Sequence, residues 1–302
     1  MIIKLSSRIF LWALLLPVLL LTSCIKEDLT NCPTGLKIYF TYSPSTYAHT
    51  GVNDSEVDRI DLFVFDSQGI FRGVWIDENP ILSPEYFMTI NNLPGGEYRF
   101  IAWCGLHGDY KTSPADFTIG QTTFNEALLR LEHNGRARNG VMPLFHAQKK
   151  ETVLNTGEQT IYMPLVQAYN TVKLTTEGLQ ESTDTYRMTI YDSNGTYYFD
   201  YSFAIDDEFS YNTICAKDDS GQLSASLNVL KLAADRNPVF EITNRTQGTT
   251  LYRENLVRLV NETGNFDYEQ IHTYNIHLKF GLDVSVSING WWVVNDGEIG
   301  LN

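Results

Sequence analysis

The chain has 302 residues and a formal net charge of −14, from 36 acidic and 22 basic side chains. This acidity disfavours nucleic acid as a partner and argues against a basic face that binds anionic lipid headgroups. Aromatic residues make up 13% of the chain, and such a composition favours strands over helices.

The first residues are organised like a secretory signal peptide. Lys4 and Arg8 precede an apolar run over residues 9–21. That run is shorter than the ~20 apolar residues that a transmembrane helix needs, and its length and flanks fit a signal peptide. We therefore predict export of the protein, with residues 1–23 removed.

The signal peptide ends in a motif that points to a specific modification. Leu21-Thr22-Ser23-Cys24 resembles the lipobox of bacterial lipoproteins, in which the chain is cleaved before the cysteine and the cysteine is acylated. We predict cleavage between Ser23 and Cys24, lipidation of Cys24, and a lipidated tether over residues 24–34. A plain signal peptide followed by a chance cysteine is the alternative. Two or more acyl chains attach a protein stably, at about 0.8 kcal/mol per buried methylene.

Alternating apolar and polar residues recur along the rest of the chain, as half-buried strands require. In the first half the apolar sets are Leu36/Ile38/Phe40, Ile60/Leu62/Val64, Tyr98/Phe100/Ala102 and Ile161/Met163/Leu165. In the second half they are Val172/Leu174, Tyr186/Met188/Ile190, Tyr197/Phe199/Tyr201/Phe203, Tyr274/Ile276/Leu278/Phe280 and Val284/Val286/Ile288. Each set predicts one strand.

Helical signals are few. One turn-spaced apolar face comprises Phe124, Leu128 and Leu131, and another lies within residues 253–262. Both predict short connecting helices. Residues 43–56 and 205–222 are polar and rich in turn-forming or acidic residues, and predict loops.

One motif occurs twice, separated by nearly half the chain. Residues 64–71 and 190–197 each contain an apolar strand, an Asp-Ser-x-Gly turn and a second apolar or aromatic strand. Glycine supplies the positive φ that such a hairpin needs. A lysine flanked by aliphatic residues precedes each copy, at Lys37 and Lys173. The repeat predicts two similar domains in tandem, over residues 35–166 and 167–302.

Many short strands with regular turns and few helices predict antiparallel β-sandwiches. Parallel sheets would need crossover helices, and the sequence offers too few of them. The predicted fold class is therefore all-β, with two tandem β-sandwich domains and few short helices.

No pattern of catalytic residues stands out. The six histidines form no metal-binding or catalytic spacing, and no phosphate loop, dinucleotide fingerprint or nucleophile elbow occurs. His277 lies on the polar face of a predicted strand and is interpreted as solvated. We predict no enzyme activity, no catalytic residue, no cofactor and no metal.

Two groups of side chains could bind a ligand but have simpler interpretations. Acidic residues cluster at Asp206, Asp207, Glu208, Asp218 and Asp219, without the spacing of a calcium loop, so a solvated charge run is favoured. Residues 197–203 and the Trp291-Trp292 pair could stack on sugars. A role in the core is favoured, since one face of a sandwich is expected to be aromatic.

Cysteines beyond Cys24 leave two alternatives open. Cys32, Cys104 and Cys215 are an odd number, so at least one is free or pairs between chains. A bridge between Cys32 and Cys104 fits an exported protein, and three buried free thiols fit equally well.

Several of these segments together resemble a known family. Leu93-Pro94-Gly95-Gly96-Glu97-Tyr98-Arg99-Phe100-Ile101-Ala102-Trp103 is similar to a strand of the FimB/Mfa-type fimbrial anchor lipoproteins, and Phe63-Val64-Phe65-Asp66 with Gly69 is similar to that family's first hairpin. The lipobox, Cys32 and the terminal Trp291-Trp292-Val293-Val294 are similar too. The resemblance covers essentially the whole chain after the signal peptide.

The resemblance implies two transthyretin-like sandwiches and a role in type V pili. An outer-membrane lipoprotein of this kind, exposed at the cell surface, holds or initiates a fimbria through β-strand contacts with fimbrial subunits. Stalk subunits of such pili are instead cut after an arginine near the first strand. Here that residue would be Arg59, which directly adjoins a predicted strand and is a poor protease site. The uncut anchor is therefore favoured; a stalk or tip subunit and a cell-surface glycan-binding lipoprotein are the alternatives.

Overall fold

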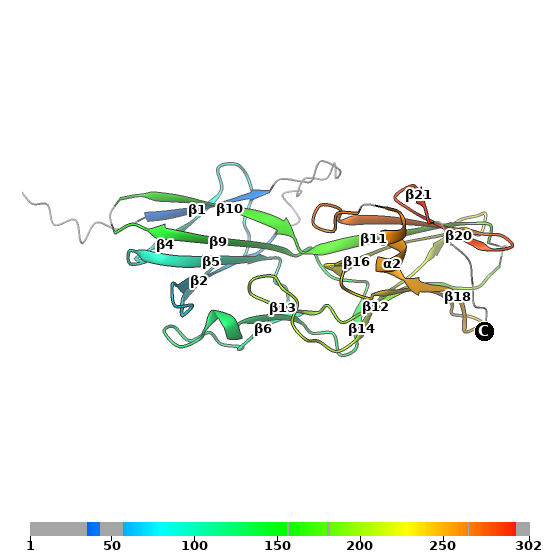
Figure 1. The fold of residues 1–302 in the computed structure, drawn as a ribbon, viewed down its shortest axis with the longest axis horizontal. Helices are drawn as coiled ribbons and strands as arrows, with labels where there is room; N and C mark the ends of the chain where they lie inside the picture. Colours follow the sequence, from blue (N-terminus) through cyan, green and yellow to red (C-terminus); the bar gives the residue numbers. More distant parts are fainter. Residues whose placement is uncertain (1–34, 43–56, 156, 180–181, 265, 294–302) are drawn as a thin grey trace, which may run out of the picture.

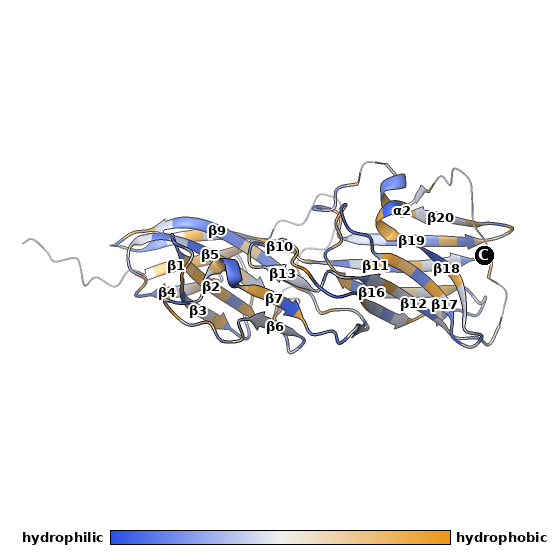
Figure 2. Cartoon of the chain, turned by 60° about the horizontal axis from the view of Figure 1, so that its bottom comes forward, coloured by the Kyte–Doolittle hydropathy of each residue, from blue (hydrophilic) through white to orange (hydrophobic). Residues whose placement is uncertain are grey.

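The computed structural model describes residues 35–42, 57–155, 157–179, 182–264 and 266–293. These residues form two lobes arranged end to end, with strands running along the long axis of the molecule (Figure 1). Apolar and polar residues alternate along the strands (Figure 2), so each sheet has an apolar face for the interior. The predicted class, an all-β sandwich architecture with few helices, is confirmed.

The first lobe contains two sheets. The larger has seven strands in the order β3-β2-β5-β9-β10-β1-β4. Their bounds are β1 Gly35–Tyr42, β2 Ile60–Asp66, β3 Phe71–Asp77, β4 Phe87–Asn91, β5 Gly96–Cys104, β9 Phe145–Val153 and β10 Gln159–Gln167. A three-stranded sheet, β13-β7-β6, comprises β6 Tyr110–Ser113, β7 Leu128–Leu131 and β13 Thr196–Tyr198.

The second lobe also contains two sheets. A six-stranded sheet, β15-β16-β11-β19-β20-β21, comprises β11 Tyr169–Glu177, β15 Ala216–Lys217, β16 Leu223–Leu230, β19 Thr273–Phe280, β20 Val284–Ile288 and β21 Trp291–Trp292. A five-stranded sheet, β18-β17-β12-β14-β8, comprises β8 Arg136–Arg138, β12 Tyr186–Asp192, β14 Phe209–Ile214, β17 Val239–Asn244 and β18 Thr249–Asn255. Helix α2, Leu256–Glu262, follows β18.

The pairing of strands is mostly antiparallel but not entirely so. β1 pairs in parallel with β10, β11 with β19, and β14 with β8. The expectation that parallel pairing needs helical crossovers was wrong here, because the chain between β1 and β10 forms further strands, all of them in the same lobe except β8. The same relation recurs in both lobes, and Lys37 and Lys173 occupy corresponding strands, β1 and β11.

Of the two predicted hairpins, only the first is confirmed. β2 and β3 pair around a turn in which the Asp66 carboxylate accepts the backbone N–H groups of Gln68 and Ile70, both at 2.9 Å, and Gly69 has φ 77°. In the second copy, β12 does not pair with β13; the chain leaves for the other lobe, where β13 pairs with β7. Buried Asn194 fixes this exit by donating to the Leu230 and Lys231 carbonyls at 3.1 Å.

Two strands belong by sequence to one half of the chain but pair with strands of the other half. β13 joins the small sheet of the first lobe, and β8 joins the five-stranded sheet of the second lobe by pairing with β14. After β8, the Val141 N–H donates to the Asn228 carbonyl of β16 at 3.0 Å. The two sequence halves therefore interlock instead of forming separate bodies.

Aromatic side chains from both halves meet at this crossing. The ring centre of Trp103 of β5 lies 4.6 Å from that of His146 of β9. It lies 6.1 and 6.0 Å from the ring centres of Tyr197 and Tyr201. The His146 ring also pairs with the Phe199 carbonyl at 3.1 Å, which requires an N–H at Nε2. One core is thus shared across the junction.

Three local predictions were wrong. The aromatic stripe is not one strand: it turns back after β13, with Tyr201 at φ 70° and the Tyr198 N–H donating to Ser202. The segment expected to be helical from Phe124 is a short 3-10 turn, η2 (Phe124–Glu126), followed by β7. The expected loop 205–222 contains β14 and β15. The helix expected within residues 253–262 is confirmed as α2.

Candidate functional site

The predicted lipidation and cleavage residues, Ser23 and Cys24, lie outside the described residues, as do Cys32 and the loop 43–56. The described chain begins with β1 at the outer end of the first lobe (Figure 1). Within the part of the chain that the structure describes, no helix is long and apolar enough to cross a membrane.

The first strand is an interior member of its sheet. β1 pairs with β10 on one side, from Leu36 opposite Gln159 to Tyr42 opposite Leu165, and with β4 on the other. Leu36 and Ile38 are 2% and 0% exposed. Removing β1 would therefore open a groove in the sheet and expose core side chains to water.

The candidate cleavage residue Arg59 is held by its neighbours. Its guanidinium contacts the Asp61 carboxylate at 2.7 and 2.8 Å and Glu78 at 3.6 Å. Its carbonyl accepts the Gly105 N–H at 2.9 Å, and Val57, two residues earlier, is fully buried. A protease needs a segment that can leave the fold and enter its active site, and these contacts hold Arg59 in place.

Strand β21 forms one edge of the second lobe's six-stranded sheet. Among the described residues it pairs with β20 alone, and Trp291 and Trp292 are 68% and 55% exposed. The prediction that these two side chains lie in the core was wrong. Tyr198 is also exposed, but it belongs to β13 at the junction of the lobes, well apart from β21 (Figure 1). These three aromatic side chains are not gathered on one sugar-binding platform.

The other titratable groups singled out in the sequence are scattered. Cys104 and Cys215 are buried free thiols, and burial raises the pKa of the Cys215 thiol to about 12. Burial also lowers the pKa of His146 to about 4. His277 is half-buried and contacts Glu177 at 3.5 Å.

Asp206 and Asp218, two of the acidic residues after position 205, each bond to neighbouring groups of the protein. Asp206 contacts the His133 ring at 3.4 Å. Asp218 closes a turn by accepting the Ser220 hydroxyl and the Gln222 N–H at 2.7 and 2.9 Å. The Ser220 hydrogen bond is the main cause that lowers the pKa of Asp218. Among the described residues, no group of three or more His, Cys, Asp or Glu side chains could hold a metal ion.

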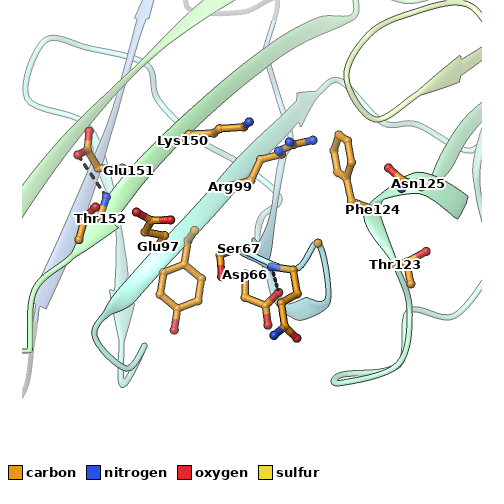
Figure 3. Close-up of a pocket in the computed structure, with 13 residues that line it drawn as sticks. Asp66, Ser67, Glu97, Arg99, Thr123, Phe124, Asn125, Lys150, Glu151 and Thr152 are labelled. Atoms are coloured by element: carbon orange, nitrogen blue, oxygen red, sulfur yellow. Dashed lines mark hydrogen bonds between the residues drawn. The ribbon is translucent and has the colours of Figure 1, made fainter.

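The structure contains a cleft that the sequence did not reveal. Its volume is about 610 Å³, and it lies between the β2–β3 turn, the outer faces of β5 and β9, and η2 (Figure 3). Arg99 and Lys150 are opposite each other across β5 and β9. Alternation places each of them on an outer face, but only the strand register brings them together.

Comparisons with known proteins agree with this architecture. The family model for Fimbrillin-A associated anchor proteins Mfa1 and Mfa2 matches residues 29–297. The minor fimbrium anchoring subunit Mfa2 of Porphyromonas gingivalis is 25% identical over 100% of this chain and 97% of that protein.

Two solved structures have the same fold. That of the fimbrial anchor protein Mfa2 from Porphyromonas gingivalis has a TM-score of 0.73 at 24% identity, covering 87% of this chain and 99% of that one. A Bacteroides thetaiotaomicron protein, described provisionally as polysaccharide binding, has a TM-score of 0.74 at 23% identity, with coverage of 87% and 99%.

Proposed function

Because this chain belongs to the family of Fimbrillin-A associated anchor proteins Mfa1 and Mfa2, we propose that it is an outer-membrane lipoprotein that anchors a fimbria at the cell surface. The family comprises structural anchor proteins and is not an enzyme class, and we propose no catalytic role for this chain. Its partners in this proposal are fimbrial subunits on one side and the membrane on the other.

The proposed attachment to the membrane is the acyl group on Cys24. Cleavage between Ser23 and Cys24 would leave residues 24–34 as the tether to β1, followed by domains over residues 35–166 and 167–302 that exchange strands β8 and β13. β1 begins at the outer end of the first lobe and β21 lies on the opposite lobe (Figure 1). A lipid at the tether would therefore leave the second lobe directed away from the membrane.

The observation that carries the anchor role, as opposed to the stalk role, is the environment of β1. This strand is paired on both sides, and the Arg59 peptide that would have to be cut to release it is packed and hydrogen-bonded. These contacts favour a subunit that keeps its own first strand.

The proposed contact with the fimbria is strand pairing at the β21 edge. Backbone hydrogen bonds provide affinity in strand addition with little demand on side-chain identity. The exposed Trp291 and Trp292 side chains would add apolar contact area at this edge. The first fimbrial subunit would thus extend the six-stranded sheet of the second lobe.

The experiment combines mass spectrometry with the location of the fibres. We expect mature protein from membranes to begin at an acylated Cys24 and to be intact across Arg59. Cys24→Ala should release fimbriae into the medium. A matched variant, Trp291→Ser with Trp292→Ser, should remain in the membrane but retain fewer fibres. An unlipidated Cys24, residues 1–23 still attached in mature protein, or cleavage after Arg59 would contradict the proposal.

A further inference from the structure

We propose that the cleft beside the β2–β3 turn binds an acidic sugar, namely a uronic acid or a sugar phosphate. The inference does not depend on the anchor role, since it concerns a surface of the first lobe that the proposed tether and fimbrial contacts do not use. The volume of the cleft, about 610 Å³, lies in the range of small-molecule sites.

Two cations face the cleft, and no described carboxylate forms a salt bridge with either. Arg99 and Lys150 are cross-strand neighbours, and like charges in this position repel each other. Among the described residues neither forms an ion pair; the Arg99 guanidinium lies over the Phe124 ring, 3.9 Å from its centre. In a chain of net charge −14, carboxylates are abundant. Two neighbouring cations that pair with no described carboxylate can therefore bind an anion from solution.

The second copy of the turn motif shows what a satisfied arrangement looks like. There Arg236 also lies over a phenylalanine ring, Phe203, at 4.7 Å. The Arg236 guanidinium is paired with the motif's own aspartate, Asp192, at 3.0 Å. In the first copy the equivalent aspartate, Asp66, is bonded to Arg72 instead. Arg99 is therefore left with its donors directed into the cleft.

The Arg99 guanidinium suits an oxyanion. Contact with the Phe124 ring restrains the Arg99 side chain, and a planar guanidinium binds carboxylate or phosphate through two parallel N–H donors. In Figure 3 the Lys150 side chain extends toward Arg99, so one anionic group can contact both.

The acidic side chains of the cleft define the rest of the ligand. Asp66 is occupied by Arg72 and by the turn, and the Glu151 carboxylate contacts the Thr152 N–H at 3.3 Å. Glu97 lies on the same face of β5 as Arg99, opposite Thr152. It can accept hydrogen bonds from hydroxyl groups, as the Thr152 and Ser67 hydroxyls also can. An anionic group attached to a polyhydroxylated ring matches this arrangement.

Titration calorimetry on the purified protein tests the proposal with glucuronate, glucose 6-phosphate, inorganic phosphate and glucose. We expect both acidic sugars to bind and glucose not to bind. Arg99→Gln and Lys150→Gln should each weaken binding of the acidic sugars at least about tenfold, since each removes a charge-assisted hydrogen bond. Glu97→Gln should weaken the acidic sugars without weakening inorganic phosphate.

Lys279→Gln is the control, because it makes the same change in net charge at a lysine paired with Glu177 outside the cleft, and it should leave binding unchanged. Lys150 is exposed, so its variant remains informative even if Arg99→Gln disturbs folding. The proposal is overturned if neither acidic sugar binds, if inorganic phosphate alone binds, or if the two cleft variants bind as tightly as the unaltered protein.

Discussion

At the scale of single residues, His146 shows how the core at the lobe junction depends on a neutral side chain. The centre of its ring lies 4.6 Å from that of Trp103, and the ring stacks on Tyr201 with a centre-to-centre distance of 5.1 Å. Burial disfavours the imidazolium and lowers the pKa of His146 to about 4, although the Phe199 carbonyl favours the charged form. Lys231 also disfavours a charge here.

This pKa predicts a loss of stability in mild acid. In the unfolded chain the imidazole binds a proton below its ordinary pKa of 6.5, whereas the folded protein binds it only near 4. The free energy of unfolding should therefore fall as the pH decreases from 6.5 to 4, by about 3 kcal/mol from this residue. His146→Gln should reduce that slope in urea unfolding measured across this range.

A second buried histidine sets the size of the change. The pKa of His272 is also lowered by burial, so some slope should remain in His146→Gln. A slope identical to that of the unaltered protein would mean that His146 is not buried in its neutral form.

At the scale of elements, sequence periodicity predicted most of the strands. Ile161, Met163 and Leu165 of β10 are buried while Tyr162 between them is exposed, as alternation requires. Periodicity gave the wrong prediction where the spacing of the apolar residues fits both a helix and a strand. Leu128 and Leu131 have helical spacing from Phe124, yet Ala127, Leu129 and Leu131 alternate as a strand, and pairing with β6 and β13 decides between them.

The candidate sites differ in how far the sequence can predict them. The lipobox is contiguous, so its prediction needs no fold. The cleft depends on the pairing of Arg99 with Lys150 and on the approach of Phe124. These are long-range contacts, and a single sequence contains no signal for them. The crossing of β8 and β13 was missed for the same reason.

The crossing of β8 requires glycine at a particular position. Gly140 has φ 80°, and a Cβ there would lie 2.1 Å from the Asn228 carbonyl oxygen of β16. Gly135, at the start of the same segment, has φ 78° with no atom within 4 Å of a Cβ. We expect Gly135→Ala to cost about 1 kcal/mol from backbone strain alone, and Gly140→Ala to cost at least about 2 kcal/mol more from overlap.

Urea unfolding of the two alanine variants measures this difference directly. The pair isolates the close contact, because both positions share the left-handed backbone. Equal losses of stability would show that the segment after β8 does not lie against β16 as described.

At the scale of the whole molecule, the exchange of β8 and β13 predicts cooperative unfolding. Neither half of the sequence can complete its sheets alone, since the small sheet of the first lobe needs β13 and the five-stranded sheet of the second contains β8. Separating them would expose the Trp103 cluster. We expect one transition for both lobes in the protein that lacks residues 1–23.

Tryptophan fluorescence can test this lobe by lobe. In Trp291→Phe with Trp292→Phe, emission comes from Trp75 and Trp103 of the first lobe, while far-ultraviolet circular dichroism reports all strands. Coincident urea transitions are expected for the two signals. Two separate midpoints would mean that the lobes unfold independently.

The double pairing of β1 has a mechanical consequence. The strand begins at the outer end of the molecule and runs along its long axis between β10 and β4 (Figure 1). Tension applied outward at residue 35 would load both ladders in shear, so their hydrogen bonds would have to rupture together instead of peeling open in succession. The first strand is thus placed to resist drag on the body that it carries.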